Sequence, residues 1–116
     1  MARLRAALRR SPTAVPRSQF ASGGLTVDLE KRLVTRSGEE IQLTPNEYAL
    51  LGVLIAHAGM VVTHRQLLQQ VWGPAYREDA HMLHVNVSNL RRKIETDPAR
   101  PEFIITEPGV GYRLRE

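Results

Sequence analysis

The residues whose types and spacing could support chemistry gather in one segment late in the chain. His81 and His84 lie three positions apart and, with Asp79, have the residue types of a zinc site. A zinc site needs three or four convergent ligands, and His57 and His64 fall in other segments. The chain has no cysteine, which excludes thiolate ligands and a cysteine nucleophile. We therefore expect ordinary exposed histidines that bind no metal. Because no serine or carboxylate arrangement suggests catalysis, we also expect no cofactor and no enzymatic activity.

The same segment predicts a helix with an unusual polar face. At helical spacing, four apolar side chains form one buried stripe: Leu83, Val87, Leu90 and Ile94. The opposite face presents short polar groups, one small apolar group and an arginine: His81, Val85, Ser88, Asn89 and Arg92. An ordinary exposed helix face would carry glutamate and lysine. The face is therefore either a solvated surface that lacks acids or a surface that contacts a ligand.

These side chains have the chemistry that recognises base edges in a DNA major groove. Asn89 can pair with adenine through two hydrogen bonds, and Val85 can touch a thymine methyl group. His81 and Ser88 can donate or accept hydrogen bonds at other base edges. Three cations toward the end of the helix suit phosphate groups: Arg91, Arg92 and Lys93. We therefore expect this helix to read the major groove.

A predicted hairpin follows the helix. Strands near 103–106 and 112–114 are joined by Glu107-Pro108-Gly109-Val110-Gly111, whose glycines are typical of a turn. A helix pair followed by such a hairpin is the arrangement in which the hairpin, or wing, lies along the DNA backbone or minor groove. Thr106 and Arg113 are placed as phosphate contacts. The hairpin favours the DNA interpretation over the solvated surface.

Turn and cap signals predict the elements that position these residues. From Phe20 to Leu43, apolar residues alternate around Gly23-Gly24 and Ser37-Gly38, which predicts an antiparallel meander of three or four strands.

Two further helices are expected before the one just described. Thr44 with Glu47, and Thr63 with Gln66, have the spacing of capping boxes. The first of these helices should end at Gly59 and the second near Trp72-Gly73-Pro74. Asp79 can cap the third helix, which should run to about Glu95 before Asp97-Pro98.

The charge distribution divides the chain. Residues 1–24 hold five arginines and no acid, whereas residues 25–116 hold eleven bases and twelve acids. The excess positive charge behind the net charge of +4 thus lies near the N-terminus. The argument for DNA binding therefore depends on the positions of individual charges and not on their sum. Residues 1–10 have the pattern of a short helix, and residues 11–19, with two prolines, that of a flexible linker. We expect one folded domain over residues 20–116.

Residues 20–116 resemble the winged-helix effector domain of OmpR/PhoB-type response regulators throughout. The matching segments are Leu43-Thr44-Pro45-x-Glu47-Tyr48-x-Leu50-Leu51, Thr63-x-Arg65-x-Leu67-Leu68-x-x-Val71-Trp72, Val85-x-Val87-x-x-Leu90-Arg91-x-Lys93-Ile94-Glu95 and Gly109-x-Gly111-Tyr112-Arg113. The resemblance implies an α+β fold, a winged helix-turn-helix with an N-terminal antiparallel β-meander, three helices and a C-terminal β-hairpin wing. Residues 66–74 and 97–101 are most similar to the Kdp-type potassium-response branch of the family.

In that family the third helix enters the major groove and the wing touches the minor groove. The resemblance places Trp72 and the loop after it at positions that contact phosphate or RNA polymerase: Gly73, Pro74, Ala75, Tyr76, Arg77 and Glu78. The chain departs from many relatives at Pro108, where they carry arginine. A proline cannot enter the minor groove as a cation, which leaves minor-groove reading by the wing unassigned.

The resemblance implies a sequence-specific double-stranded DNA-binding transcription regulator, the output domain of a two-component system, with potassium-transport genes as candidate targets. Its implied partners are promoter DNA, RNA polymerase and a sensor histidine kinase acting through a receiver domain, whose last helix would end in residues 1–19. A dimer on tandem half-sites and a cytoplasmic location are expected. No apolar run approaches the ~20 residues that a membrane helix needs.

An interaction module that keeps the winged-helix fold is the alternative. A protein-binding surface would expose large apolar anchors on the third helix. Only Val85 is apolar at the centre of that face.

Overall fold

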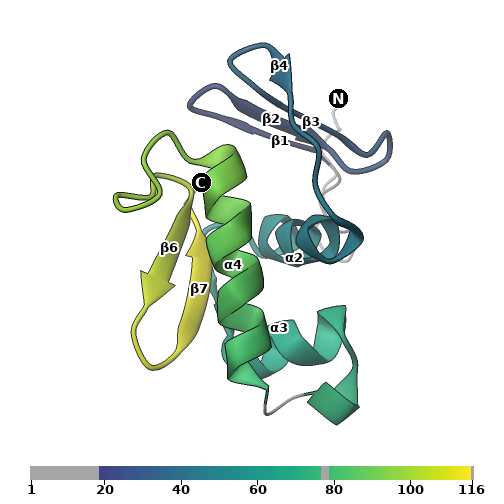
Figure 1. The fold of residues 1–116 in the computed structure, drawn as a ribbon, viewed down its shortest axis with the longest axis vertical. Coiled ribbons are helices and arrows are strands. Elements are labelled where there is room, and N and C mark those ends of the chain that lie inside the picture. Colours follow the sequence, from purple (N-terminus) through teal and green to yellow (C-terminus); the bar gives the residue numbers. More distant parts are fainter. Residues whose placement is uncertain (1–18, 77–78, 116) are drawn as a thin grey trace, which may run out of the picture.

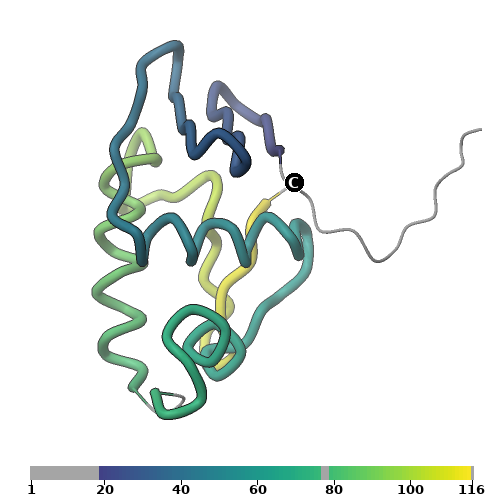
Figure 2. Tube along the Cα trace, turned by 90° about the vertical axis from the view of Figure 1, so that its right-hand side faces the viewer, coloured from purple at the N-terminus to yellow at the C-terminus, as the bar shows by residue number. Residues whose placement is uncertain are grey.

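The computed structural model describes residues 19–76 and 79–115, so the predicted N-terminal helix and most of the linker lie outside the described residues. Within this range, two antiparallel sheets flank helices α2 (Pro45–Ala56), α3 (His64–Val71) and α4 (Ala80–Ile94) (Figure 1). Viewed from the side in Figure 2, the first sheet lies above α2, and α3 lies below it. The order of strands, helices and strands is the predicted one.

The first sheet is the expected antiparallel meander. Its strands follow the order β1 (Gln19–Ser22), β2 (Leu25–Asp28), β3 (Leu33–Arg36) and β4 (Glu39–Glu40). Gly24 and Gly38 occupy the turns with φ of 88° and 85°, where a side chain would be strained. β1 begins at Gln19, which pairs with Asp28, one residue before the expected start of the folded domain.

Both predicted capping boxes are present. Thr44 Oγ1 accepts from Glu47 N at 3.2 Å, while Glu47 Oε1 accepts from Thr44 N at 3.0 Å. The equivalent bonds at the start of α3, between Thr63 and Gln66, measure 3.1 and 2.9 Å. α2 ends at Ala56, before the expected Gly59, because the next amides bond three residues back and tighten the chain into a turn.

α2 is the centre of the core. Gly52 of α2 faces Leu29 in the β2–β3 turn, and Arg32 of the same turn lies over the Tyr48 ring at 4.4 Å. The same helix packs against α3 and α4. Because α2 has neighbours on more than one side, it buries apolar residues around much of its circumference: Tyr48, Leu50, Leu51, Leu54 and Ile55.

α4 matches its predicted bounds and stripe. Asp79 Oδ1 accepts from Met82 N at 3.2 Å and caps the helix, whose chain turns to an extended conformation at Glu95. Its buried residues are the four predicted ones: Leu83, Val87, Leu90 and Ile94. The α4 residues that were predicted to contact DNA therefore lie on the outer side and the flanks of this helix.

The second sheet contains the predicted hairpin, β6 (Ile104–Glu107) and β7 (Gly111–Leu114), and one strand that the sequence did not predict. That strand, β5 (Val61–Thr63), pairs with β7, giving the order β5-β7-β6. Gly111 makes the pairing feasible, because a Cβ there would lie 1.9 Å from the Val62 carbonyl oxygen. The wing is thus anchored to the start of α3.

Candidate nucleic-acid interface

The five side chains expected on the exposed face of α4 line one shallow hollow. Its walls are His81, His84, Val85, Ser88, Asn89 and Arg92. No aspartate or glutamate of the described residues lines it. Among the described residues, Val85 is the one large apolar side chain exposed on α4, at 43%. The hollow therefore suits a polar, negatively charged partner better than an apolar protein surface.

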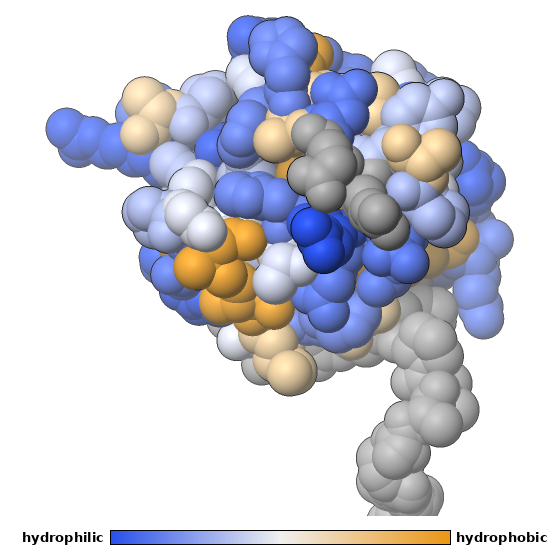
Figure 3. Space-filling view, turned by 90° about the horizontal axis from the view of Figure 1, so that it is seen from below, coloured by the Kyte–Doolittle hydropathy of each residue, from blue (hydrophilic) through white to orange (hydrophobic). Residues whose placement is uncertain are grey.

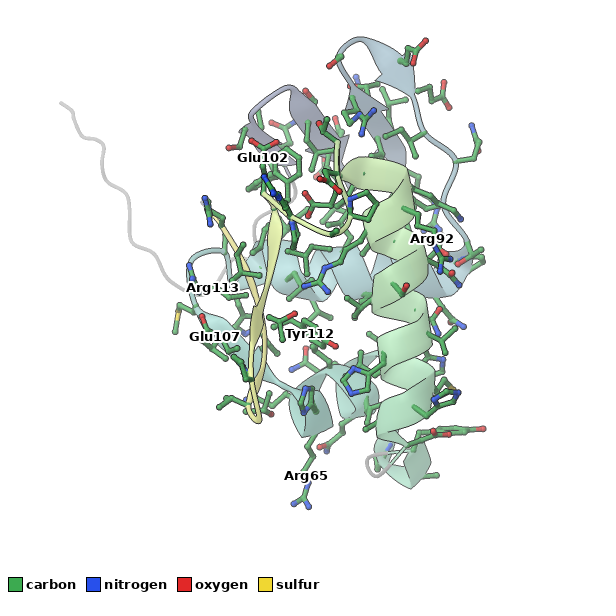
Figure 4. All side chains as sticks on the ribbon, turned by 60° about the vertical axis from the view of Figure 1, so that its left-hand side comes forward. Arg65, Arg92, Glu102, Glu107, Tyr112 and Arg113 are labelled. Atoms are coloured by element: carbon green, nitrogen blue, oxygen red, sulfur yellow. The ribbon has the colours of Figure 1, made fainter. Side chains whose placement is uncertain are left out.

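Arg92 and Asn89 are already joined within this hollow. Arg92 Nη1 donates to Asn89 Oδ1 at 2.7 Å, from the next turn of the helix, and Figure 4 shows Arg92 on the outer side of α4. An amide oxygen has two lone pairs, so Asn89 Oδ1 can accept from a base while it stays bonded to Arg92. The arginine thereby restricts the orientation of the amide.

Arg91, expected to contact phosphate, turns toward the wing instead. Its Nη2 donates to Ile104 O at 2.8 Å and to Thr106 Oγ1 at 2.7 Å, and its Nε donates to Ile104 O at 3.2 Å. The guanidinium also lies 5.5 Å from the centre of the Tyr112 ring. Arg91 therefore connects α4 to both strands of the hairpin.

Lys93 is likewise bound to another element of the protein. Its Nζ lies 2.6 Å from Glu47 Oε1, and the glutamate side chain is only 3% exposed. Glu47 thus serves both the α2 capping box and an ion pair that ties α2 to α4. A buried carboxylate needs such a counter-charge, because leaving it alone in the core would be costly.

The two wing residues expected to contact phosphate lie on opposite faces of the second sheet. Thr106 is opposite Tyr112 in the ladder, and Arg113 is opposite Ile105, so the two side chains alternate across the sheet. Thr106 faces α4, whereas Arg113 Nε pairs with Glu107 Oε2 at 3.1 Å on the far side (Figure 4). The structure does not bring them together.

The far side of this sheet is also where apolar groups are exposed. Val61 is 40% exposed and Val110, in the β6–β7 turn, is 48% exposed. Seen from below in Figure 3, a compact hydrophobic group lies on the side of the wing, while the neighbouring surface is mostly hydrophilic. The α4 hollow and the apolar wing surface are therefore different surfaces.

The segment expected to contact phosphate or polymerase follows α3. Trp72 ends the helix half-buried against the core. Gly73 has φ of 112°, which favours glycine, and leads into the short 3-10 turn η1 (Pro74–Tyr76). Pro74, Ala75 and Tyr76 are exposed, Tyr76 by 47%. Arg77 and Glu78 lie outside the described residues.

One positioning residue, Glu95, was missed by the sequence reasoning. The Glu95 side chain is buried and accepts from three backbone amides, those of Glu102, Phe103 and Ile104, at 2.7 to 3.2 Å. Its own carbonyl accepts from Arg36 Nη1 at 2.8 Å. Glu95 thereby fixes the end of α4 to the start of β6. A single glutamate at a helix end gave no signal of this role.

A second group missed by the sequence reasoning joins α3, α4 and β7. His84 Nδ1 is 2.5 Å from the Tyr112 hydroxyl, and the His64 ring lies 5.3 Å from the His84 ring. Burial, and then the neighbouring His84, lower the pKa of His64. Burial raises the pKa of Tyr112, against the opposing effect of Arg91. Within the described residues, no three His, Cys, Asp or Glu side chains converge as metal ligands.

Known proteins share this arrangement. The family model described as "Transcriptional regulatory protein, C terminal" matches residues 38–114. The chain belongs to this family. The KDP operon transcriptional regulatory protein KdpE of Escherichia coli (strain K12) is 52% identical over 114 residues, which are 97% of this chain and 51% of that protein. The chain therefore spans about half the length of the first curated relatives it matches.

Solved structures agree with the predicted fold. The response regulator DrrB, a Thermotoga maritima OmpR/PhoB homolog, superposes with a TM-score of 0.76 at 32% identity, covering 85% of this chain and 45% of that one. The Klebsiella pneumoniae RstA DNA-binding domain, in complex with the RstA box, gives 0.76 at 28% identity, with coverages of 85% and 98%. The prediction of an OmpR/PhoB-type winged-helix domain is confirmed. No helix in its described part is long and apolar enough to cross a membrane.

Proposed function

We propose that this OmpR/PhoB-type domain binds double-stranded promoter DNA sequence-specifically, with α4 in the major groove. One observation carries the proposal: a hollow on the outer face of α4, lined by hydrogen-bonding side chains and Arg92 and, within the described part of the chain, by no acid. A protein surface that bound only phosphates would need only cations, whereas one that recognises base edges needs hydrogen-bond donors and acceptors at fixed positions.

Within the hollow, each group has a distinct task. Asn89, oriented by Arg92, pairs with adenine, and Val85 contacts a thymine methyl group. His81 and Ser88 bond to neighbouring base edges. Arg92 binds phosphate at the rim. These assignments make the hollow the source of sequence preference.

The remaining candidates have supporting tasks. Trp72 contacts the backbone, and residues 73–78 face RNA polymerase or phosphate. Thr106 contacts backbone beside α4, and Arg113 would contact it only by leaving Glu107. We assign Arg91 and Lys93 to positioning rather than to phosphate, since binding phosphate would cost them their present partners.

For the whole protein, we propose an output role in a two-component system in the cytoplasm, where promoter DNA is found. Residues 1–19 would contain the end of the last receiver helix and a linker to this domain. The receiver itself would be acted on by a sensor histidine kinase. The 52% identity to KdpE supports potassium-transport genes as targets. Because a single module offers few base contacts, it should bind weakly alone and more tightly as two copies on tandem half-sites.

Fluorescence anisotropy tests the proposal. A duplex selected by the domain from a random library is compared with a scrambled duplex, each with one or two half-sites, at physiological salt. We expect preference for the selected duplex and a further gain on tandem sites. Arg92→Ala should weaken binding to both duplexes, and Lys31→Ala, which removes an exposed cation from the β2–β3 turn, is its matched control. Equal affinity for selected and scrambled duplexes would contradict the proposal.

A further inference from the structure

Three aromatic side chains from distant parts of the sequence meet beside the hollow. His64 begins α3, His84 lies in the middle of α4, and Tyr112 lies in β7. The ring centres of the two histidines are 5.3 Å apart, and Tyr112 lies 5.6 and 6.1 Å from them. The three rings meet edge to face.

This cluster lies between the two parts of the fold that approach DNA in the proposed function. On one side, His84 forms part of the wall of the hollow. On the other, the backbone amide of His64 donates to Val110 O, in the turn of the wing, at 3.1 Å. When α4 occupies a major groove and the wing lies along the neighbouring backbone, the intervening phosphodiester strand passes between them. In that arrangement the strand would pass the histidine pair, because His84 lines the hollow and the His64 amide bonds to the turn of the wing.

The rings have donor capacity to spare. His84 uses Nδ1 toward the Tyr112 hydroxyl, and no other described residue takes its Nε2. No described residue bonds to a ring nitrogen of His64 either. A phosphate group accepts hydrogen bonds from imidazole N–H groups and prefers the charged, doubly protonated ring.

Among the described residues, the charged and titratable neighbours of the pair are cationic or neutral. On α4, His81 precedes His84 by three positions and Arg91 lies over the Tyr112 ring; on α3, Arg65 follows His64; on β7, the Tyr112 hydroxyl bonds to His84. On β6, Glu107 lies on the opposite face of the sheet, paired with Arg113. No carboxylate is among the causes that move the pKa of His64, which burial and His84 lower. Within the described part of the chain, the two histidines thus have no carboxylate partner in the DNA-free protein.

We propose that His64 and His84 form a proton-linked binding site for a backbone phosphodiester of the DNA strand that passes between α4 and the wing. The inference rests on the proposed function. The anion supplies the charge that the cluster lacks, so the protonated histidines are favoured in the complex. Binding therefore takes up protons, and affinity rises as pH falls through the histidine range.

The sign and size of the effect follow from linkage. A pKa that is higher in the complex than in the DNA-free protein makes binding tighter below it, by up to tenfold for each unit of difference. We expect the affinity to rise about three- to tenfold as pH falls from about 7.5 to 6. Acidification also lowers folding stability, because the pKa of His64 is depressed in the folded chain, so circular dichroism must confirm folding at each pH.

The experiment is an anisotropy titration on the selected duplex across this pH range at constant ionic strength. His64→Gln and His84→Gln keep a polar side chain of similar size that cannot be protonated. Each should reduce the dependence of affinity on pH. His57→Gln is the matched control, since His57 bonds to Val53 O at the end of α2, away from this site. Ring-proton NMR should show the His64 midpoint moving upward when duplex is added.

The outcomes separate this inference from the proposed function. Tight, selective binding that does not change with pH would overturn the inference alone. So would a pH dependence that survives in both His64→Gln and His84→Gln. No selective binding at any pH would overturn the proposed function and, with it, the proton-linked site.

Discussion

Replacing Arg91 with alanine should destabilise the domain even when no DNA is present. The side chain makes three hydrogen bonds to the hairpin, two of them to Ile104 O and one to Thr106 Oγ1. Hydrogen bonds from a charged group contribute ~1.5–3 kcal/mol each when well formed. Because this guanidinium is only half-buried and its bonds share acceptors, we expect a total loss of about 2–3 kcal/mol.

Urea denaturation followed by circular dichroism measures this loss. For a small domain whose free energy of unfolding falls by about 1–3 kcal/mol per molar urea, the midpoint should drop by roughly 0.7–3 M. Arg92→Ala is the matched control, because it removes the same charge from the next position but only one exposed hydrogen bond. It should change stability by less than about 0.5 kcal/mol. Arg91→Lys should not restore the midpoint, since an ammonium cannot span both acceptors.

The competing role for Arg91 is a phosphate contact. That role predicts unchanged stability of the DNA-free domain and a salt slope of binding reduced by about 0.9. Equal urea midpoints for Arg91→Ala and Arg92→Ala would refute the assignment of Arg91 to positioning. Reduced protection of the β6 amides against hydrogen exchange in Arg91→Ala would support it.

Three further changes have defined outcomes. Asn89→Ala should reduce the discrimination between bases by about 1–3 kcal/mol, measured by repeating the duplex selection. Arg92→Ala should instead weaken binding to selected and scrambled duplexes alike, and should lower the slope of log affinity against log salt concentration by about one. Gly111→Ala should lower stability by at least ~3 kcal/mol in thermal melts, because its Cβ would overlap the β5 backbone, whereas Gly38→Ala, with open space around it, should cost ~1–2 kcal/mol. Deleting residues 1–18 should reduce salt-sensitive affinity for any duplex and leave the sequence preference intact; loss of the preference would show that this segment reads bases.

Local signals in the sequence were sufficient for the helices and the turns. A capping box such as that of Thr44 and Glu47 is complete within four residues, so its geometry does not depend on distant parts of the chain. The buried stripe of α4 follows from helical spacing alone, and it left the residues that line the hollow on the outer face. Positive φ at Gly24 and Gly38 is a property of the turn itself.

Tertiary structure decided the roles of the charged residues. Arg91, Arg92 and Lys93 are consecutive cations with the same apparent purpose in the sequence. Successive helix positions point in different directions, so Arg91 meets the wing, Arg92 faces outward and Lys93 meets Glu47. The partner that each side chain meets depends on how the other elements pack around α4, and it cannot be predicted from the local sequence pattern.

The same reason separates what was predicted of the wing from what was not. Its glycines and alternating residues predict a hairpin, but β5 is only three residues long and joins the sheet because Gly111 admits its backbone. The ladder then places Thr106 and Arg113 on opposite faces, and it brings Tyr112 to two histidines from different helices. Sequence spacing determines contacts within a segment, whereas the hollow's neighbours and the histidine pair arise from contacts between segments, which exist only once the chain is packed.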